Sequence, residues 1–551
     1  MGHVRLRVIP ARLQSVNSQL HQGRAMASNY STPGVYINEV NGFANSDVPI
    51  ATAVPAFIGY TPKADYQGKS YYDKPQKISS FAEFQAFFML SDLPPPADPA
   101  RQYSPHYYLV QQSCLPTSGQ YLVLNNQYYS VLPDPSTIYY LYNSVRLFYL
   151  NGGGDAYIVA VGPYGPPGKK PATDPSAPVV NPNVQLADLQ RGLALLQNEQ
   201  EPTMYICPEA TLLSVADNGA LMQSMLLQAD EMSTALCIFD IIDGANPDPV
   251  SYTRDIQTFR DSVGNTGLKY GTSYYPFVGT TVMQPSDIDF TNLFGGDATP
   301  LGPLLNPPSA PNPAVATLLE MIQKPPANPM TNSQLQAALL VASPLYSQIV
   351  NHVLSSANTL PPSGAIAGVY TVNDNNQGVW GAPANVGIVG AASLPICLSE
   401  SQQEPLNIDA VSGKSVNAIR FFNGLGILIW GARTLDGNSQ DWRYLSVRRT
   451  MTYLEQSVKL ATRQYIFSPN KADTWLAVKS MITSFLVGVW RSGGLQGSSP
   501  ADAFQVNVGL GSTMTADDVL NGYLRVSVLV ATVRPAEFLV IMFQQEQAKS
   551  V

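Results

Sequence analysis

Apolar and polar positions follow helical spacing over much of the last hundred residues of this 551-residue chain. Apolar side chains recur every three or four positions in residues 445–467 and again in residues 471–491, which is the stripe of a helix packed along its length. Asn470 and Asp473 form a capping pattern at the start of the second segment, and Gly493 ends it. The pattern therefore predicts two long, packed helices.

Strand patterns follow these helices. Thr515 and Asp518 are placed to cap a short helix, and residues 523–533 alternate between polar and apolar side chains as a half-buried strand does. Burial stabilises a large apolar side chain by about 1.5–3 kcal/mol, so the apolar run that comes next needs cover on both faces. It is either the central strand of this subunit's own sheet or a strand that completes a sheet in another subunit. Its apolar positions are Phe538, Leu539, Val540, Ile541 and Phe543.

A second short strand pattern lies near the start of the chain. Pro33-Gly34 is a turn signal, and the strand that follows over residues 35–40 would on its own be an exposed edge. Residues 47–60 then form an apolar segment that enters the core, and Ser80 is placed to cap a helix with three phenylalanines on one face. The candidate pairing residues of the first strand are Val35, Tyr36, Ile37 and Val40.

The pattern changes at the proline run of residues 93–99. From there to about residue 395, stretches rich in proline, tyrosine and asparagine separate helix-like segments from short apolar strands such as residues 204–207 and 236–242. Alternating helices and short apolar strands predict a small α/β layer. We expect residues 95–395 to form an outer α/β domain, inserted into a unit that the two ends of the chain build.

Composition narrows the classes of function. The formal net charge of −8, with charged residues at 13%, argues against nucleic acid as the main partner. No apolar run reaches the roughly 20 residues needed to span a bilayer, so we expect no membrane insertion. Residues 1–25 carry four arginines and no acid, and we expect a disordered extension or a start codon assigned too early; a basic arm that meets an acidic partner is the alternative.

Candidate chemistry is sparse. NGGGD at residues 151–155 lacks the Gly-Lys-Ser/Thr ending of a P-loop and is typical of a tight turn. Asp240 and Asp243 follow a predicted strand, at the edge where open α/β sheets bind ligands, although turn formation explains the same residues. There is no nucleophile elbow, Cys-x-x-Cys pair or histidine cluster. The sequence therefore predicts no enzyme and no cofactor, with a ligand site at Asp240 and Asp243 as the alternative.

Several separate motifs, in the right order, resemble those of contractile phage tail sheath proteins. They are GARTLDGNSQDWRYLSVRRT, TWLAVKSMITSFLVGVWRSGGLQG, FQVNVGLGSTMTADDVLNGYL and RPAEFLVIMF in the last third, with TPGVYINEV and ATAVPAFIGYT near the start. The resemblance implies a structural subunit that polymerises helically around an inner tube and contracts to drive that tube through a target membrane. It also implies terminal strands that are lent to neighbouring subunits, and a baseplate and terminal cap proteins as further partners.

Together, the patterns and the resemblance predict an α+β fold with a mixed sheet, packed helices and swapped terminal strands. The expected segments are a basic disordered extension at 1–26, an N-terminal arm at 27–44, an inner sheath domain from 45–94 and 396–535, the inserted outer domain at 95–395, and a C-terminal arm at 536–551. We expect part of a phage tail or of a phage-tail-like injection particle, assembled in the bacterial cytoplasm. A static tube or shell protein is a further alternative.

One face of the first long helix is basic, through Arg448, Arg449, Lys459 and Arg463. Lys459 and Arg463 are like charges one helical turn apart, which costs a little stability unless a partner supplies negative charge. A solvated helix face accounts for the same pattern. In the light of the resemblance, the alternative is a contact with the inner tube, with the short helix near residues 515–521 as the next candidate.

Overall fold

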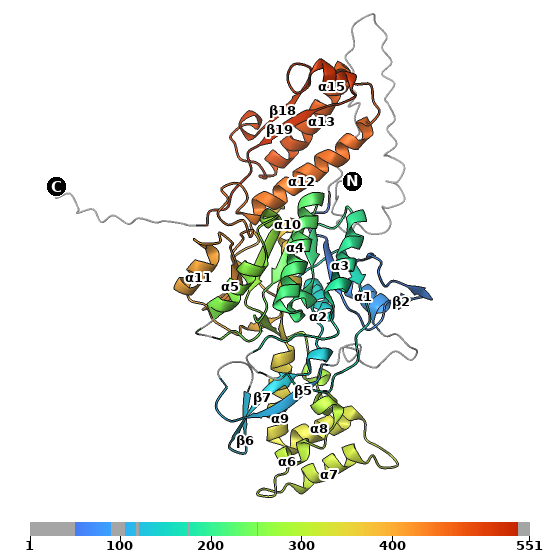
Figure 1. Cartoon of the computed structure of the whole chain (residues 1–551), viewed down its shortest axis with the longest axis vertical. Coiled ribbons are helices and arrows are strands. Elements are labelled where there is room, and N and C mark those ends of the chain that lie inside the picture. Colours follow the sequence, from blue (N-terminus) through green and yellow to red (C-terminus); the bar gives the residue numbers. More distant parts are fainter. Residues whose placement is uncertain are drawn as a thin grey trace, which may run out of the picture. The chain divides into compact units, whose positions relative to one another are not determined.

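The computed structural model describes residues 50–89, 105–116, 121–172, 174, 177–248, 250 and 252–537. The chain divides into two compact units (Figure 1). Among the described residues, the large unit lies within 51–454, 489–505 and 530–537, and the small unit comprises residues 50, 455–488 and 506–529.

The large unit is built on a mixed sheet that has nine strands among the described residues, in the order β14-β17-β16-β11-β10-β9-β1-β8-β4. The six strands from β16 to β8 run parallel, whereas β4 and β17 pair antiparallel with their neighbours and β14 pairs antiparallel with β17. All five residues of β1 are buried, as a strand covered on both faces requires. The bounds are β1 Pro55–Gly59, β4 Gln76–Ile78, β8 Ala156–Ala160, β9 Met204–Ile206, β10 Leu236–Asp240, β11 Gly271–Tyr275, β14 Val386–Gly387, β16 Asn417–Phe422 and β17 Gly426–Trp430.

Helices cover both faces of this sheet. Phe57 of β1 packs edge-on against Phe148 of α2, with ring centroids 5.6 Å apart. The next residue, Ile58, faces Gly192 of α3, where an added Cβ would lie 2.9 Å from the Ile58 Cγ2. Successive strand residues point to opposite faces, so α2 and α3 lie on opposite sides. The helices around the sheet are α1 Phe81–Phe88, α2 Leu141–Leu150, α3 Leu186–Leu195, α4 Val215–Met232, α5 Tyr252–Ser262, α10 Ser363–Gln377 and α11 Glu400–Asn407.

This sheet corrects the predicted domain boundaries. The strands β8 to β11 fall inside the expected insertion at residues 95–395. However, β8 and β9 lie on either side of β1, which precedes the insertion in the chain, and β11 pairs with β16, which follows the insertion. The strands β8 to β11 therefore belong to the central sheet and do not form a separate α/β layer. The physical reason lies in β1, which is apolar on both faces and needs a hydrogen-bonded partner strand along each edge. Both partner strands, β8 and β9, come from the middle of the chain.

A second cluster within the large unit combines a three-stranded sheet, β5-β7-β6, with α9, which packs on β6 and β7. Its elements are β5 Tyr107–Gln112, β6 Tyr121–Leu124, β7 Gln127–Pro133, α6 Leu301–Leu305, α7 Pro313–Gln323, α8 Asn332–Ala342 and α9 Pro344–Ala357. Smaller sheets are β13 Thr359–Leu360, β12 Val278–Thr280 and β15 Ala391–Ser393, and the pair β2 Asp65–Tyr66 and β3 Lys69–Ser70. In the described part of the chain no single helix suits a membrane span; α8 and α9 together pass by length and composition but are bent by 118°.

The predicted C-terminal helices are present, and the boundary between the two units falls inside both of them. A capping box between Thr515 and Asp518 starts the short helix α15, as predicted. Asn470 was predicted to cap α13, but its side-chain oxygen instead accepts a hydrogen bond of 2.6 Å from Trp475 Nε1. The elements are α12 Leu445–Thr462, α13 Ala472–Arg491, α14 Pro500–Ala503, β18 Phe504–Val508, α15 Ala516–Leu520 and β19 Val526–Val530.

Candidate functional site

The position where sheets of this topology bind ligands lies between the carboxyl ends of β1 and β9. The chain places β8 on one side of β1 and then, through α3, places β9 on the other side. This reversal of direction opens a crevice at the carboxyl edge of a doubly wound sheet. Here Glu209 occupies that position; it follows directly after β9, in the 3-10 helix Pro208–Leu212, and has no exposed surface.

Glu209 completes the start of α2 instead of facing solvent. Its Oε1 accepts a hydrogen bond of 2.9 Å from the backbone N–H of Leu141, the first residue of α2, which has no side-chain cap of its own. The fit is tight, because a Cβ added at Gly59 would lie 2.4 Å from Glu209 Oε2. Burial raises the pKa of Glu209 to about 8, and backbone hydrogen bonds oppose that rise only in part. The crevice is therefore closed by a structural carboxyl group.

Asp240 is also a structural carboxyl group. It ends β10, is 6% exposed, and accepts hydrogen bonds from the backbone N–H (2.9 Å) and the hydroxyl (2.5 Å) of Ser363. Ser363 is the first residue of α10, so Asp240 supplies an acceptor at the positive end of that helix. Burial raises the pKa of Asp240 to about 7, against the effect of the two Ser363 hydrogen bonds.

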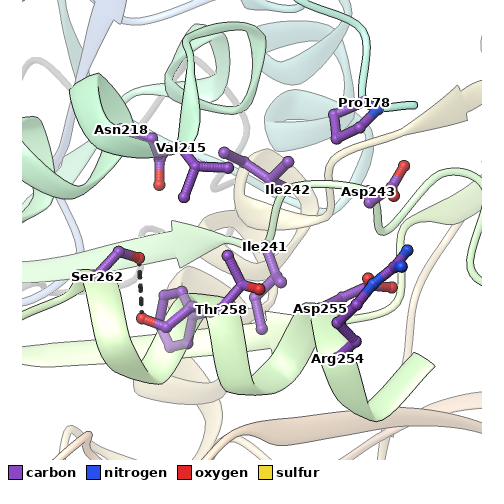
Figure 2. Close-up of a pocket in the computed structure, with 11 residues that line it drawn as sticks. Pro178, Val215, Asn218, Ile241, Ile242, Asp243, Arg254, Asp255, Thr258 and Ser262 are labelled. Carbon is purple, nitrogen blue, oxygen red and sulfur yellow. Dashed lines mark hydrogen bonds between the residues drawn. The ribbon is translucent and has the colours of Figure 1, made fainter. Parts of the chain in front are cut away.

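Asp243 lies apart from Asp240 and lines a pocket of about 220 Å³ (Figure 2). Figure 2 shows Asp243, Arg254 and Asp255 gathered at one end of this pocket. Burial raises the pKa of Asp243 to about 6 and that of Asp255 to about 7; the charge of Asp243 adds to the second rise, and Arg254 opposes both. The prediction of one ligand site that joins Asp240 and Asp243 is therefore wrong, because the two carboxyl groups have separate surroundings.

Metal-ligating residues do not cluster in the described residues, where no group of three or more His, Cys, Asp and Glu could hold a metal ion. The cysteines are all free, with Cys207 and Cys237 buried and Cys114 and Cys397 exposed. Burial raises the pKa of both buried thiols, which keeps them protonated and unreactive.

The predicted basic face of α12 divides into two halves. Arg449 is 6% exposed and forms a buried ion pair with Asp374, whose Oδ2 lies 2.6 Å from Arg449 Nη2. Arg448 is 3% exposed, and its guanidinium lies over the rings of Tyr270 and Trp442 at 4.7 and 4.5 Å. Both arginines are thus held within the large unit, and the prediction that they face the tube is corrected by their burial.

Lys459 and Arg463 are exposed, and they belong to the small unit. They keep the one-turn spacing that the sequence indicates, since α12 continues to Thr462 and a 3-10 turn, Arg463–Tyr465, follows it. A contact between these two cations and a partner is consistent with this exposure and stays a prediction.

The strands β18 and β19 form a small sheet of their own. Among the described residues this sheet has two strands and no third. Along β19, Ser527 and Leu529 are exposed, whereas Val526, Val528 and Val530 are half-buried. The outer strands of a sheet are the places where a further extended segment can add through backbone pairing.

The strands of both predicted terminal arms lie outside the described residues. These are the strand residues Val35, Tyr36, Ile37 and Val40, and Phe538, Leu539, Val540, Ile541 and Phe543. Directly before the second of these strands, within the arm predicted at 536–551, Glu537 is described and forms an ion pair with Arg433. Sequence patterns did not identify Glu209, Arg433 or Glu537 as important residues. Both glutamates are single acids beside an apolar run, which is a sequence signal for a buried carboxyl group.

Comparison with known proteins was most specific at the end of the chain. Residues 438–546 match the family described as the phage tail sheath C-terminal domain. The tail sheath protein of Vibrio phage KVP40 is 25% identical over 139 residues, which are 25% of this chain and 20% of that relative. The matched part thus spans about a fifth of the curated relative's length.

Two solved structures resemble nearly the whole chain. A chain in the cryo-EM structure of the anti-feeding prophage baseplate has a TM-score of 0.54 and 24% identity, and covers 94% of this chain and 100% of its own. A chain in the sheath complex of PVC, an extracellular contractile injection system, in its contracted state has a TM-score of 0.52 and 22% identity, and covers 94% and 98%. The sequence-based resemblance and the α+β fold with a mixed sheet are confirmed.

Proposed function

We propose that this chain, which carries a phage tail sheath C-terminal domain and the fold of contractile sheath proteins, is the sheath subunit of a contractile injection machine. It polymerises helically around an inner tube and contracts to drive the tube forward through a target membrane. Strand donation from one subunit to the next is a head-to-tail interaction, and such interactions produce open helical arrays. The role is structural, without catalysis.

The small sheet β18–β19 is the observation that carries this proposal. It lies within the residues that match the sheath domain, and it offers edges to which an extended segment of another subunit can add. The chain has two segments suited to this, residues 35–40 and 538–543, which are apolar and close to the chain ends. Backbone pairing of this kind keeps subunits linked while their bodies rotate.

The closed crevice supports a structural role over an enzymatic one. Doubly wound enzymes use the reversal point of the sheet for their ligand, whereas here Glu209 fills it and caps α2. The pocket at Asp243 and Asp255 is a further concave candidate, and its 220 Å³ is below the usual range of about 300–1,000 Å³ for ligand sites.

An extracellular injection particle is favoured over a phage tail. The sheath of PVC, an extracellular contractile injection system, and a chain of the anti-feeding prophage baseplate each align with 94% of this chain. Such a particle would assemble in the bacterial cytoplasm and then be released. Its other parts would be the inner tube protein, the baseplate and a terminal cap, and the exposed cations Lys459 and Arg463 are the candidate contact with the tube.

Negative-stain microscopy of the protein, expressed with and without its tube protein, tests the function. We expect helical sheaths in two forms, long and narrow around the tube and short and wide without it. Particles of one fixed length and width would indicate a static tube or shell instead. A protein that stays monomeric at high concentration would overturn the proposal.

Removal of residues 538–551 tests strand donation in the same assay. We expect the truncated chain to fold with an unchanged thermal midpoint and to form no sheath. Normal sheaths from the truncated chain would contradict donation of this strand. Collapse of the folded core would instead show that the segment belongs to the subunit's own sheet.

A further inference from the structure

The segment that leads into the C-terminal arm is tied to the body of the large unit by one buried ion pair. Arg433 Nε donates to Glu537 Oε1 at 2.9 Å and Arg433 Nη2 donates to Glu537 Oε2 at 2.5 Å, which is the two-pronged arrangement that guanidinium and carboxylate groups favour. Asn407 Nδ2 donates a third hydrogen bond, of 3.0 Å, to Glu537 Oε1. We propose that this clamp positions the root of the C-terminal arm.

Burial makes the clamp stronger than a surface ion pair. The Arg433 side chain is 3% exposed and that of Glu537 is 21% exposed. Burial would raise the pKa of Glu537, but the hydrogen bonds from Arg433 and Asn407 outweigh it and hold the pKa below its ordinary value. The carboxylate is therefore charged when it faces the arginine, and solvent screening of the pair is weak.

Arg433 is itself fixed to the central sheet. Its backbone N–H donates to Asn417 Oδ1 at 2.8 Å, and its carbonyl accepts hydrogen bonds from Asn417 Nδ2 (2.9 Å) and Thr272 Oγ1 (3.0 Å). Asn417 and Thr272 belong to β16 and β11 and have no exposed surface. Glu537 is thus connected through Arg433 to the buried central sheet of the large unit.

The residues just before Glu537 have weaker attachments. Ala531 exchanges backbone hydrogen bonds of 2.8 Å with Ala503 and Gln496, and Thr532 forms a bridge with Leu495. Beyond that point, the described residues 533–536 are half-buried or exposed, and the ion pair of Arg534 with Asp441 is long, at 4.0 Å, and solvent-exposed. Glu537 is therefore the point that sets where the chain leaves the body.

In the proposed sheath, on which this assembly role rests, a fixed root decides the direction and reach of the donated strand. Residue 538, the first residue of the predicted strand, follows Glu537 directly in the sequence. No linker residues therefore separate the clamp from the strand. A loosened root would add the residues from 533 onward to the tether. Since extended chain spans about 3.3 Å per residue, five released residues would add about 16 Å of reach and lower the local concentration of the strand at its target.

Hydrogen exchange on the isolated subunit tests the clamp without any assembly. We expect Arg433→Met and Glu537→Gln to accelerate amide exchange in residues 531–537 by about tenfold or more, since each removes charged hydrogen bonds. Arg191→Met is the matched control, because Arg191 makes ion pairs with Asp73 and Asp188 at 45% exposure in the same unit. An unchanged exchange rate in both clamp variants would overturn the clamp.

Assembly of the full chain with its tube protein tests the positioning role. We expect Arg433→Met and Glu537→Gln each to lower the yield of sheaths about tenfold, and the double variant to lose no more than either single one. If Arg433→Met does not fold, Glu537→Gln still provides the test. We expect Glu537→Gln to fold, since its amide oxygen still accepts a hydrogen bond. Accelerated exchange with normal sheath yield would overturn the positioning role. Failure of the unaltered chain to assemble would overturn the proposed function, while the exchange result would still decide the clamp.

Discussion

Buried carboxyl groups in this chain hold helices in place, and Glu209 is the clearest example. Its pKa in the folded state, about 8, lies above the ordinary value of 4.5, so its protonated form is favoured in the fold. Its contribution to stability is fully present below pH 4.5 and is lost as the pH rises through 8. Over that window the loss is at most about 1.4 kcal/mol for each pH unit.

Glu209→Gln should remove this dependence, because the amide still accepts from Leu141 N–H and cannot ionise. Relative to the unaltered protein, we expect the variant's unfolding free energy to improve steadily between pH 5 and pH 8 and then to level off. Urea unfolding across that range measures the difference. For Glu320→Gln, at an exposed position, the unfolding free energy should depend on pH as it does in the unaltered protein. The same pH dependence for Glu209→Gln would contradict the raised pKa of Glu209.

The two halves of the basic face of α12 should respond differently to charge reversal. Arg449→Glu places a second carboxylate against Asp374 in a buried site, and breaking such a pair costs about 3–5 kcal/mol. We expect an insoluble or unfolded protein. Lys459→Glu with Arg463→Glu should keep the thermal midpoint, because both side chains are exposed, and should weaken co-assembly with the tube. Unchanged co-assembly across a salt series would leave α15 as the next candidate.

At the scale of elements, the exposed side of β19 should matter for assembly more than for folding. The Leu529 side chain is 57% exposed, so Leu529→Glu should change the unfolding free energy by no more than about 0.5 kcal/mol. We expect it to lower sheath yield sharply, because a charge beside an open strand edge discourages strand addition. Val341→Glu on α8, at 88% exposure, is the control. Equal sheath yields for the two variants would argue against β19 as the receiving strand.

The proline-rich stretches differ in what they contact. The stretch at 165–182 is bound to the large unit, since Lys169 N–H donates 2.7 Å to Asp134 and the buried Asn181 donates 2.8 Å to the Ile138 carbonyl. Its deletion should lower the thermal midpoint by several degrees. Replacement of the exposed residues 325–329 by Gly and Ser should leave midpoint and assembly unchanged. Calorimetry of both variants would settle the contrast, and equal midpoints would contradict it.

Sequence patterns predicted elements well where the signal is local. The helix after Ser80 begins as predicted, with Ser80 accepting from Glu83 N–H, and the capping box at Thr515 is present. What they missed depends on residues far apart in the chain: Arg433 meets Glu537 across 104 positions, and Arg449 meets Asp374 across 75. A helical stripe shows which face is charged, but only the fold shows whether another segment covers that face.

At the scale of the whole molecule, the strand order shows that the bounds predicted for an insertion at residues 95–395 cut through the central sheet. Proline-rich loops mark breaks between elements. Such loops occur both between strands of one sheet and between separate domains, so they do not distinguish the two cases. The apolar run of β1 required two partner strands, but periodicity carries no information about which strands those are. The six parallel strands use segments from Pro55 to Phe422, so no continuous piece of the chain corresponds to the sheet.

This strand order has a consequence during synthesis. β1 gains its second partner only when Ile206 has left the ribosome, and the arm root is fastened only when Glu537 follows, 537 − 206 = 331 positions later. At about 5–20 residues per second, roughly 17–66 s separate the two events. A nascent subunit therefore has time to pair both edges of β1 before its C-terminal donor strand exists.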